Sequence, residues 1–314
     1  MSLLTILAAA TTGGVVTPPP PTDPRPATDD PILAALRPNG RSIGTITVGP
    51  TGDYATIGAG RDAALTLQAA SLASEGRTVP TPNDRVDILV EPGIYDEVLW
   101  IPGGKWFAFY AADPTQTTRL EHHNAAGVST GDLGTLATNG AIYWEGIDVS
   151  LEKVAGQESN WPKYPIHHVG DRTSIFAACT LNAYSASAVA LTPIGMDGVN
   201  GGTTLLYDVA LGTGATNMHG SLDNSAATAE TMIYVNCTSP STINFQGMVA
   251  SDGDLWVVDC TAATISANNA TLHVSGSTGT VTLAGSATQD TNAAWPVPTG
   301  GLSAADRAYY GMPS

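Results

Sequence analysis

The sequence is poor in basic residues, cysteines and charged residues in general, and each scarcity argues against a class of protein. Twelve Lys and Arg face 28 Asp and Glu, so the net charge of −16 repels phosphate backbones and polyanionic sugars. We therefore expect no nucleic-acid partner. The three cysteines form neither an even framework nor a C-x-x-C pair, which disfavours a disulfide scaffold or a structural zinc site.

Long apolar runs are also missing. The initial SLLTILAAA is shorter than the roughly 20 residues that span a bilayer, and no basic residue precedes Arg25 to form the charged region of a signal peptide. We therefore expect no membrane segment and no cleaved signal. The chain is instead rich in Gly, Ala, Thr and Ser, a composition that suits many short strands joined by tight turns.

Composition divides the chain into three parts. Residues 1–40 contain a proline run, which favours extended polyproline II, and a short helix candidate from Ile32; this part is predicted to be an arm or linker held by another chain. Residues 41–290 carry the strand-like segments. Residues 291–314 are predicted to be a tail with a short helix that begins after Ser303.

Five segments of the central part repeat one pattern. They are IYWEGID, IFAACTL, LLYDVAL, IYVNCTS and WVVDCTA, and they align Ile147, Cys179, Val209, Cys237 and Cys260, which are 32, 30, 28 and 23 residues apart. Internal similarity at such a period indicates a solenoid, because each unit buries its apolar face only by stacking on the next. We interpret the aligned position as an inward row in which cysteine acts as a small apolar residue and not as a nucleophile.

The residue before each aligned position suggests a corner. Asp208, Asn236 and Asp259 are predicted to stack as a polar ladder where a strand ends, bonding neighbouring backbone amides.

The start of the solenoid resembles a known family. A strand, ITVGP, precedes an alanine-rich helix candidate over residues 54–74, and ILVEPGIYDEVLWI follows with Gly93, Tyr95 and Glu97 in a G-x-Y-x-E turn. Residues 44 to about 120 resemble the N-terminal part of pectin methylesterases and, more widely, the pectin-lyase-like superfamily. The resemblance implies an all-β, right-handed parallel β-helix with an N-terminal capping helix, here preceded by the extended Pro-rich arm.

The resemblance does not extend to catalysis. The esterases use two aspartates, an arginine and glutamines on successive coils, and no segment here matches their motifs; TQDT at Thr288 follows the last clear coil. We therefore predict no catalytic residue and no cofactor. An unrecognised carboxylate pair, the basis of an alternative esterase or lyase function, would have to come from five acidic residues, namely Glu97, Glu145, Asp148, Asp171 and Asp208.

Histidines and aromatic residues supply the other candidate contacts. His122-His123 and His167-His168 lie on strand-like segments, where neighbours point to opposite faces, so we predict no metal site. Three aromatic residues are candidates for stacking on a sugar or packing against another subunit, and the sequence leaves both open: Trp144, Trp161 and Tyr164.

These features favour a non-enzymatic structural protein of a virion, in the form of a phage minor tail or capsid decoration protein. Its predicted partners are other virion proteins, bound through residues 1–40, and further copies of itself, with a trimer as the candidate state. A host-surface glycan is a further candidate ligand. The alternative is a secreted carbohydrate-active β-helix, either an esterase, a lyase or a glycan-binding module.

Overall fold

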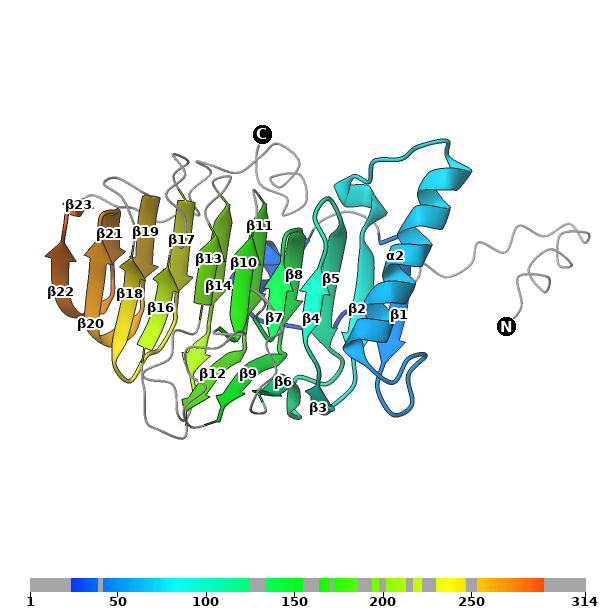
Figure 1. The fold of residues 1–314 in the computed structure, drawn as a ribbon, viewed down its shortest axis with the longest axis horizontal. Helices are drawn as coiled ribbons and strands as arrows, with labels where there is room; N and C mark the ends of the chain where they lie inside the picture. The colour runs from blue at the N-terminus through cyan, green and yellow to red at the C-terminus, as the bar shows by residue number, and fades with distance from the viewer. Residues whose placement is uncertain are drawn as a thin grey trace, which may run out of the picture.

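The structure is a computed structural model that describes residues 24–38, 42–124, 134–154, 164–169, 172–185, 194–197, 202–212, 217–221, 230–246 and 253–290. Every strand pairing among these residues is parallel, and successive turns of the chain stack along one axis (Figure 1). The predicted all-β parallel β-helix is therefore confirmed. Among the described residues, no helix has the length and apolar character needed to cross a membrane.

One sheet, which we call sheet A, runs along the whole stack. Each coil supplies one strand, so chain order is also spatial order, with β1 at one edge and β23 at the other. Its ten strands are β1 (Gly44–Val48), β2 (Val86–Val90), β5 (Trp106–Ala111), β8 (Ala141–Glu145), β11 (Thr173–Ala177), β14 (Thr203–Tyr207), β17 (Glu230–Val235), β19 (Gly253–Val258), β21 (Thr271–Ser275) and β23 (Thr288–Asp290).

Shorter sheets complete the walls of the solenoid. Sheet B contains β3 (Gly93–Asp96), β6 (Thr118–Asn124), β9 (Asp148–Lys153), β12 (Thr180–Ser185) and β15 (Ala210–Leu211). Sheet C contains β4 (Leu99–Ile101), β7 (Leu136–Thr138), β10 (Ile166–Val169) and β13 (Ile194–Asp197). Sheet D contains β16 (Asn217–Ser221), β18 (Thr242–Gln246), β20 (Thr261–Asn268) and β22 (Thr278–Ala284). Because β16 contacts β13, sheet D follows sheet C along the stack (Figure 1).

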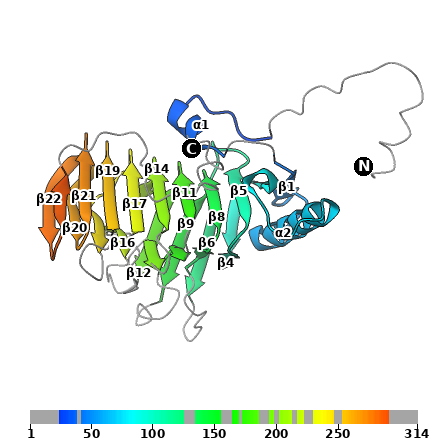
Figure 2. The same ribbon diagram turned by 90° about the horizontal axis from the view of Figure 1, so that it is seen from above.

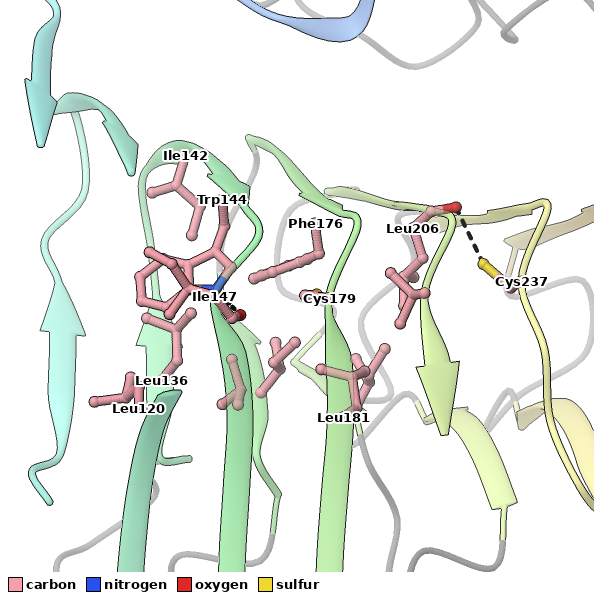
Figure 3. Packing of buried hydrophobic residues seen from close by; sticks show 14 of the residues in the cluster. Leu120, Leu136, Ile142, Trp144, Ile147, Phe176, Cys179, Leu181, Leu206 and Cys237 are labelled. Atoms are coloured by element: carbon pink, nitrogen blue, oxygen red, sulfur yellow. Dashed lines mark hydrogen bonds between the residues drawn. The ribbon is translucent and has the colours of Figure 1, made fainter. Parts of the chain in front are cut away.

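The interior is built from rows of equivalent side chains. The predicted inward row is confirmed, since its members are at most 5% exposed: Ile147, Cys179, Val209, Cys237 and Cys260. A second buried row comes from sheet A and consists of Phe109, Trp144, Phe176, Leu206 and Tyr234. Figure 3 shows members of both rows meeting inside the coils. Neighbours in a row lie one strand spacing apart, about 4.8 Å, so each coil buries the apolar surface of the next.

The corner that follows the sheet A strand repeats in five successive coils. Its residues are left-handed, with φ values from 50° to 71°, and are Gly146, Ala178, Asp208, Asn236 and Asp259. Glycine, asparagine and aspartate tolerate this conformation, whereas alanine is strained in it. The backbone N–H of each of these residues donates to a carbonyl of the next coil, and Asn236 Nδ2 donates to Asp208 Oδ1 at 3.2 Å. The predicted polar ladder is seen between Asp208 and Asn236, although this bond joins two side chains and the predicted bonds were to backbone amides. The left-handed conformation explains the glycine, aspartate and asparagine at this position.

Helix α2 (Ile57–Ser74) lies at the N-terminal end of the stack, as predicted, and contacts β1, β2 and β4 (Figure 1). Thr56 caps its first turn, and Glu97 accepts hydrogen bonds from the N–H groups of Ile57 (2.7 Å) and Gly58 (2.9 Å). These donors have no partner inside the helix, so Glu97 joins the helix to the first coil. The G-x-Y-x-E turn thus has a structural role. A 3₁₀ turn, η3 (Pro82–Asp84), precedes β2.

The part of the arm that the structure describes is not a free linker. Residues 24–38, which we call the strap, include helix α1 (Pro31–Leu36) and lie against the outer face of sheet A (Figure 2). The sequence predicted a short helix from Ile32 within residues 1–40, which α1 confirms. It also predicted that another chain holds this part, whereas the strap docks on sheet A of its own chain. Residues 1–23 and the predicted tail, 291–314, lie outside the described residues.

Candidate functional site

The strap contains a helix that the sequence specifies locally. Asp30 caps α1 by accepting hydrogen bonds from the N–H groups of Ile32 (2.8 Å) and Leu33 (3.1 Å), and Pro31 occupies the first position, where no N–H is needed. Leu33 and Leu36 are buried in an apolar cluster on the outer face of sheet A. A six-residue helix is unstable alone, so this burial holds it.

A buried ion pair fixes the end of the strap. Arg37 Nε donates to Glu145 Oε2 at 2.8 Å, its Nη2 contacts Glu145 Oε1, and its guanidinium lies 5.8 Å from the ring centroid of Tyr110. Tyr143 Oη donates to Glu145 Oε2 at 2.6 Å. Burial opposes the charge on Arg37, but the hydrogen bond to Glu145 and its charge outweigh this, so the pKa of Arg37 is raised. Two nitrogens of Arg37 thus bind the two carboxylate oxygens of Glu145, and we call this pair the arginine clamp.

Two further contacts hold the strap, one at its middle and one at its C-terminal end. At the middle, Tyr207 Oη of β14 donates to Asp30 Oδ2 at 2.6 Å. Burial raises the pKa of Asp30, but this bond and those from the α1 amides lower it more, so the net pKa is lowered. At the C-terminal end, the carbonyl of Pro38 accepts from Arg85 Nη1 at 3.2 Å, and Arg85 is paired with Asp87 of β2 at 2.7 Å. The strap therefore crosses sheet A from β14 back to β2.

The aromatic candidates do not form a sugar platform. Trp144 was predicted as a contact residue, and this is wrong: it is fully buried in the core, where its Nε1 donates to the Ile147 carbonyl at 2.7 Å (Figure 3). Its ring lies 5.0 Å from that of Phe109. Tyr164 is 7% exposed and its ring lies 5.5 Å from that of His167, so it offers no free face of useful area. Trp161 lies outside the described residues.

The described members of the carboxylate pool lie apart, each in a contact of its own. Glu97 caps α2, Glu145 binds Arg37 on the outer face of sheet A, and Asp208 occupies a corner. Asp148 accepts from the Thr180 N–H at 2.8 Å and lines a small polar pocket. Asp171 lies outside the described residues. Each of the four described members thus has its own contacts, and they do not form a carboxylate pair that could act together on one substrate carbonyl group.

A row of charged side chains that the sequence did not predict lies on the outer face of sheet B. His123 bridges two carboxylates, with Nδ1 2.6 Å from Glu152 and Nε2 2.8 Å from Glu121. The hydrogen bond with Glu121 is the main reason why the pKa of His123 is raised. Arg119 lies 3.9 Å from Glu121 and 3.7 Å from Asp148. Equivalent outward positions of β6 and β9 bring these side chains together.

The second histidine pair and the three cysteines are packing residues. His167 and His168 are both buried, and burial lowers the pKa of His168 to about 4. Burial raises the pKa of Cys179 far above its usual value, which opposes a nucleophilic role. Within the described part of the chain, no group of three or more His, Cys, Asp and Glu side chains is arranged to hold a metal ion.

The docking site for the strap had a signal in the sequence. In KWFAFYAA and IYWEGID the apolar residues occupy both alternating faces, which indicates a strand covered on both sides. Tyr143 and Glu145 of β8 share the outer face with Tyr110 of β5, and the strap lies on them. An acidic residue on a covered face requires a cation, and Arg37 provides it.

Comparison with protein-family models gives no match for this chain, and comparison with curated proteins gives none either.

Proposed function

We propose that this chain is a non-enzymatic structural protein of a virion, a phage minor tail or capsid decoration protein, anchored through its N-terminal arm. The observation that carries the proposal is the strap. Its contacts with β14, β8 and β2 join the arm to several coils at once. A pull on residues 1–23 is therefore transmitted to the solenoid through Asp30 and the Arg37–Glu145 pair, which suits an anchor that carries a rigid body.

The distribution of acidic side chains supports the same proposal. Glu97 and Glu145 already stabilise α2 and the strap, respectively, so neither is available as a free acid or base. A solenoid with a purely structural role needs no free acid or base. Self-association completes the proposal: a trimer, the candidate state, would present three arms to one attachment point.

The test removes the arm while leaving its docked part in place. Virus particles are purified from two cultures of cells that encode the chain. One culture supplies the full chain, and the other supplies a chain that lacks residues 1–23. The full chain is expected in the particles and as density by electron cryo-microscopy, and the shortened chain is expected to fold equally well by circular dichroism but to be missing from them. A full chain that stays freely secreted and monomeric would overturn the proposal.

A second assay separates the carbohydrate-active alternative. Purified full chain is incubated with esterified pectin and with host-envelope glycans, alongside Asp148→Asn, because Asp148 is the member of the carboxylate pool that lines a polar pocket, with Gln116 and Thr118. We expect no methanol and no new reducing ends. Release by the full chain that is lost in Asp148→Asn would replace the proposal with an enzymatic function.

A further inference from the structure

The inward row brings two cysteines into contact on neighbouring coils. Cys237 follows β17 and Cys260 follows β19, and the backbone N–H of Cys237 lies 3.3 Å from Cys260 Sγ. Burial, and then a hydrogen bond between the two thiols, raise the pKa of Cys237 well above its usual value. Both side chains are buried, with exposures of 0% and 1%. No other described pair of thiols in the row is adjacent, because Cys179 has Ile147 and Val209 as its neighbours.

The backbone fixes the two residues at a separation that a disulfide accepts. Thr238 and Thr261, the next residues, form a parallel bridge, and the N–H of Thr261 donates to the carbonyl of Cys237 at 2.9 Å. Neighbouring strands lie about 4.8 Å apart, and disulfides span Cα separations of roughly 4.4–6.8 Å. The strand spacing between Cys237 and Cys260 therefore falls within the Cα separation that a disulfide spans.

We propose that Cys237 and Cys260 are an oxidation site at which a low-molecular-weight disulfide, such as glutathione disulfide, converts the thiol pair into a cross-link between two coils. In the first step the Cys260 thiol loses its proton and attacks one sulfur of glutathione disulfide, releasing one glutathione thiolate. In the second, Cys237 loses its proton and attacks the Cys260 sulfur, and the second glutathione leaves. Two protein thiols are oxidised and one glutathione disulfide is reduced to two thiols.

The surroundings make Cys260 the first thiol to react. The hydrogen bond from Cys237 is the main reason why the pKa of Cys260 is lowered, while Cys237 is the more deeply enclosed thiol. Cys260 also lies nearer the last described coils, where β22 is exposed along almost its whole length. Its N–H donates to Ser277 Oγ, which occupies the next place along the row. Opening of this one coil gives a small disulfide access to Cys260.

The test uses the full chain with glutathione disulfide. Remaining thiols are alkylated in denaturant, and intact mass and peptides cut at Asp252 or Asp254 are measured. We expect a single alkylated cysteine, Cys179, a loss of about 2 Da from the joined pair, and a melting temperature about 5 °C higher. Three alkylated cysteines, or a stable glutathione adduct on Cys260 without the joined peptide, would overturn the proposal.

Valine variants supply the controls, because Val209 already occupies the row. Cys179→Val is expected to cross-link like the natural chain, whereas Cys237→Val and Cys260→Val are expected not to. The peptide map of the unsubstituted chain decides the matter even where a variant fails to fold. The reaction is repeated at temperatures at which the amide hydrogens of β21 exchange freely, so that lack of access cannot explain three free thiols.

Discussion

The early and late coils of the solenoid share one interior and differ in cross-section. Coils from β2 to β14 place strands in three sheets, whereas the coils that begin with β17, β19 and β21 have one strand in sheet A and one in sheet D. Sheet B narrows to the two residues of β15 and then to single bridges at Thr238 and Thr261. The spacing of the repeated position falls from 32 to 23 residues because one side of each coil is lost.

The outer face of sheet A differs in the same direction. The early half receives the strap, with charged contacts at Glu145 and Tyr207. In the late half the row of outward side chains continues with Trp256, whose ring stacks on that of His273 with 3.9 Å between the ring centroids. His273 also contacts the carboxylates of Asp254 and Asp290. Packing of inner rows is thus common to the whole rod, while charged docking is a property of its early half.

The largest expected effect comes from breaking the arginine clamp. Arg37→Met leaves Glu145 buried without its cation, which is expected to cost about 3–5 kcal/mol of unfolding free energy. Urea titration and hydrogen exchange should place the loss in the strap, β5 and β8. Arg37→Met combined with Glu145→Gln should recover much of it. Equal loosening of β19 and β21 would show that the two halves do not differ in this way.

The next largest effect is the dependence of stability on pH, which we assign to His168 in the early half. Burial lowers the pKa of His168 to about 4, against an unfolded value near 6.5, so the unfolded chain binds the proton more readily between these values. Stability is therefore expected to fall by up to about 3 kcal/mol as the pH drops from 6.5 to 4. His123 has a raised pKa, so its contribution is present below 6.5 and is lost as the pH rises through its folded pKa.

Urea midpoints from pH 4 to pH 7 measure this dependence. His168→Asn, which does not titrate, should flatten the curve over that window, and an unchanged slope in this variant would assign the proton uptake to another group. The pH response should be seen in the amide exchange of β10 before that of β21.

Substitutions at the corner are expected to change the stability less, and in opposite directions at two positions. Ala178→Gly relieves a left-handed alanine, φ 50°, and is expected to stabilise the fold by about 1 kcal/mol. Gly146→Ala does the reverse, since φ there is 71° and the added Cβ would lie 3.0 Å from the Ala111 Cβ. Thermal melting of both variants checks this. The same sign in both would mean that the corner conformation is not what selects these residues.

The smallest effect is expected at the late half's charged cluster. Asp254 and Asp290 have side chains that are 45% and 41% exposed. Solvent screens such contacts, so Asp254→Asn and Asp290→Asn should each change the unfolding free energy by less than about 1 kcal/mol. A loss comparable with that of Arg37→Met, measured in the same urea titration, would remove the distinction between the halves.

The repeat allowed the fold and the inward row to be predicted, because stacking imposes one residue class on one position. Trp144 was predicted as a contact residue and is buried. Simple alternation counted back from the inward Ile147 would place Trp144 on the outer face, and it fails because the left-handed corner at Gly146 shifts the alternation by one residue. The strap could not be placed from sequence, since Arg37 and Glu145 lie 108 residues apart and no local pattern pairs them. The His123 bridge depends in the same way on inter-coil register.

The strap also has a consequence for how the chain folds. Asp30 meets Tyr207 across 177 residues of sequence, although a ribosome releases Asp30 long before β14 exists. Docking must therefore wait for at least five strands of sheet A to stack, and closing so long a loop is slow. The strap is thus synthesised before the strands on which it docks and is one of the last segments to reach its native place. Until then the outer face of β5 and β8 is open to any chaperone or neighbouring chain.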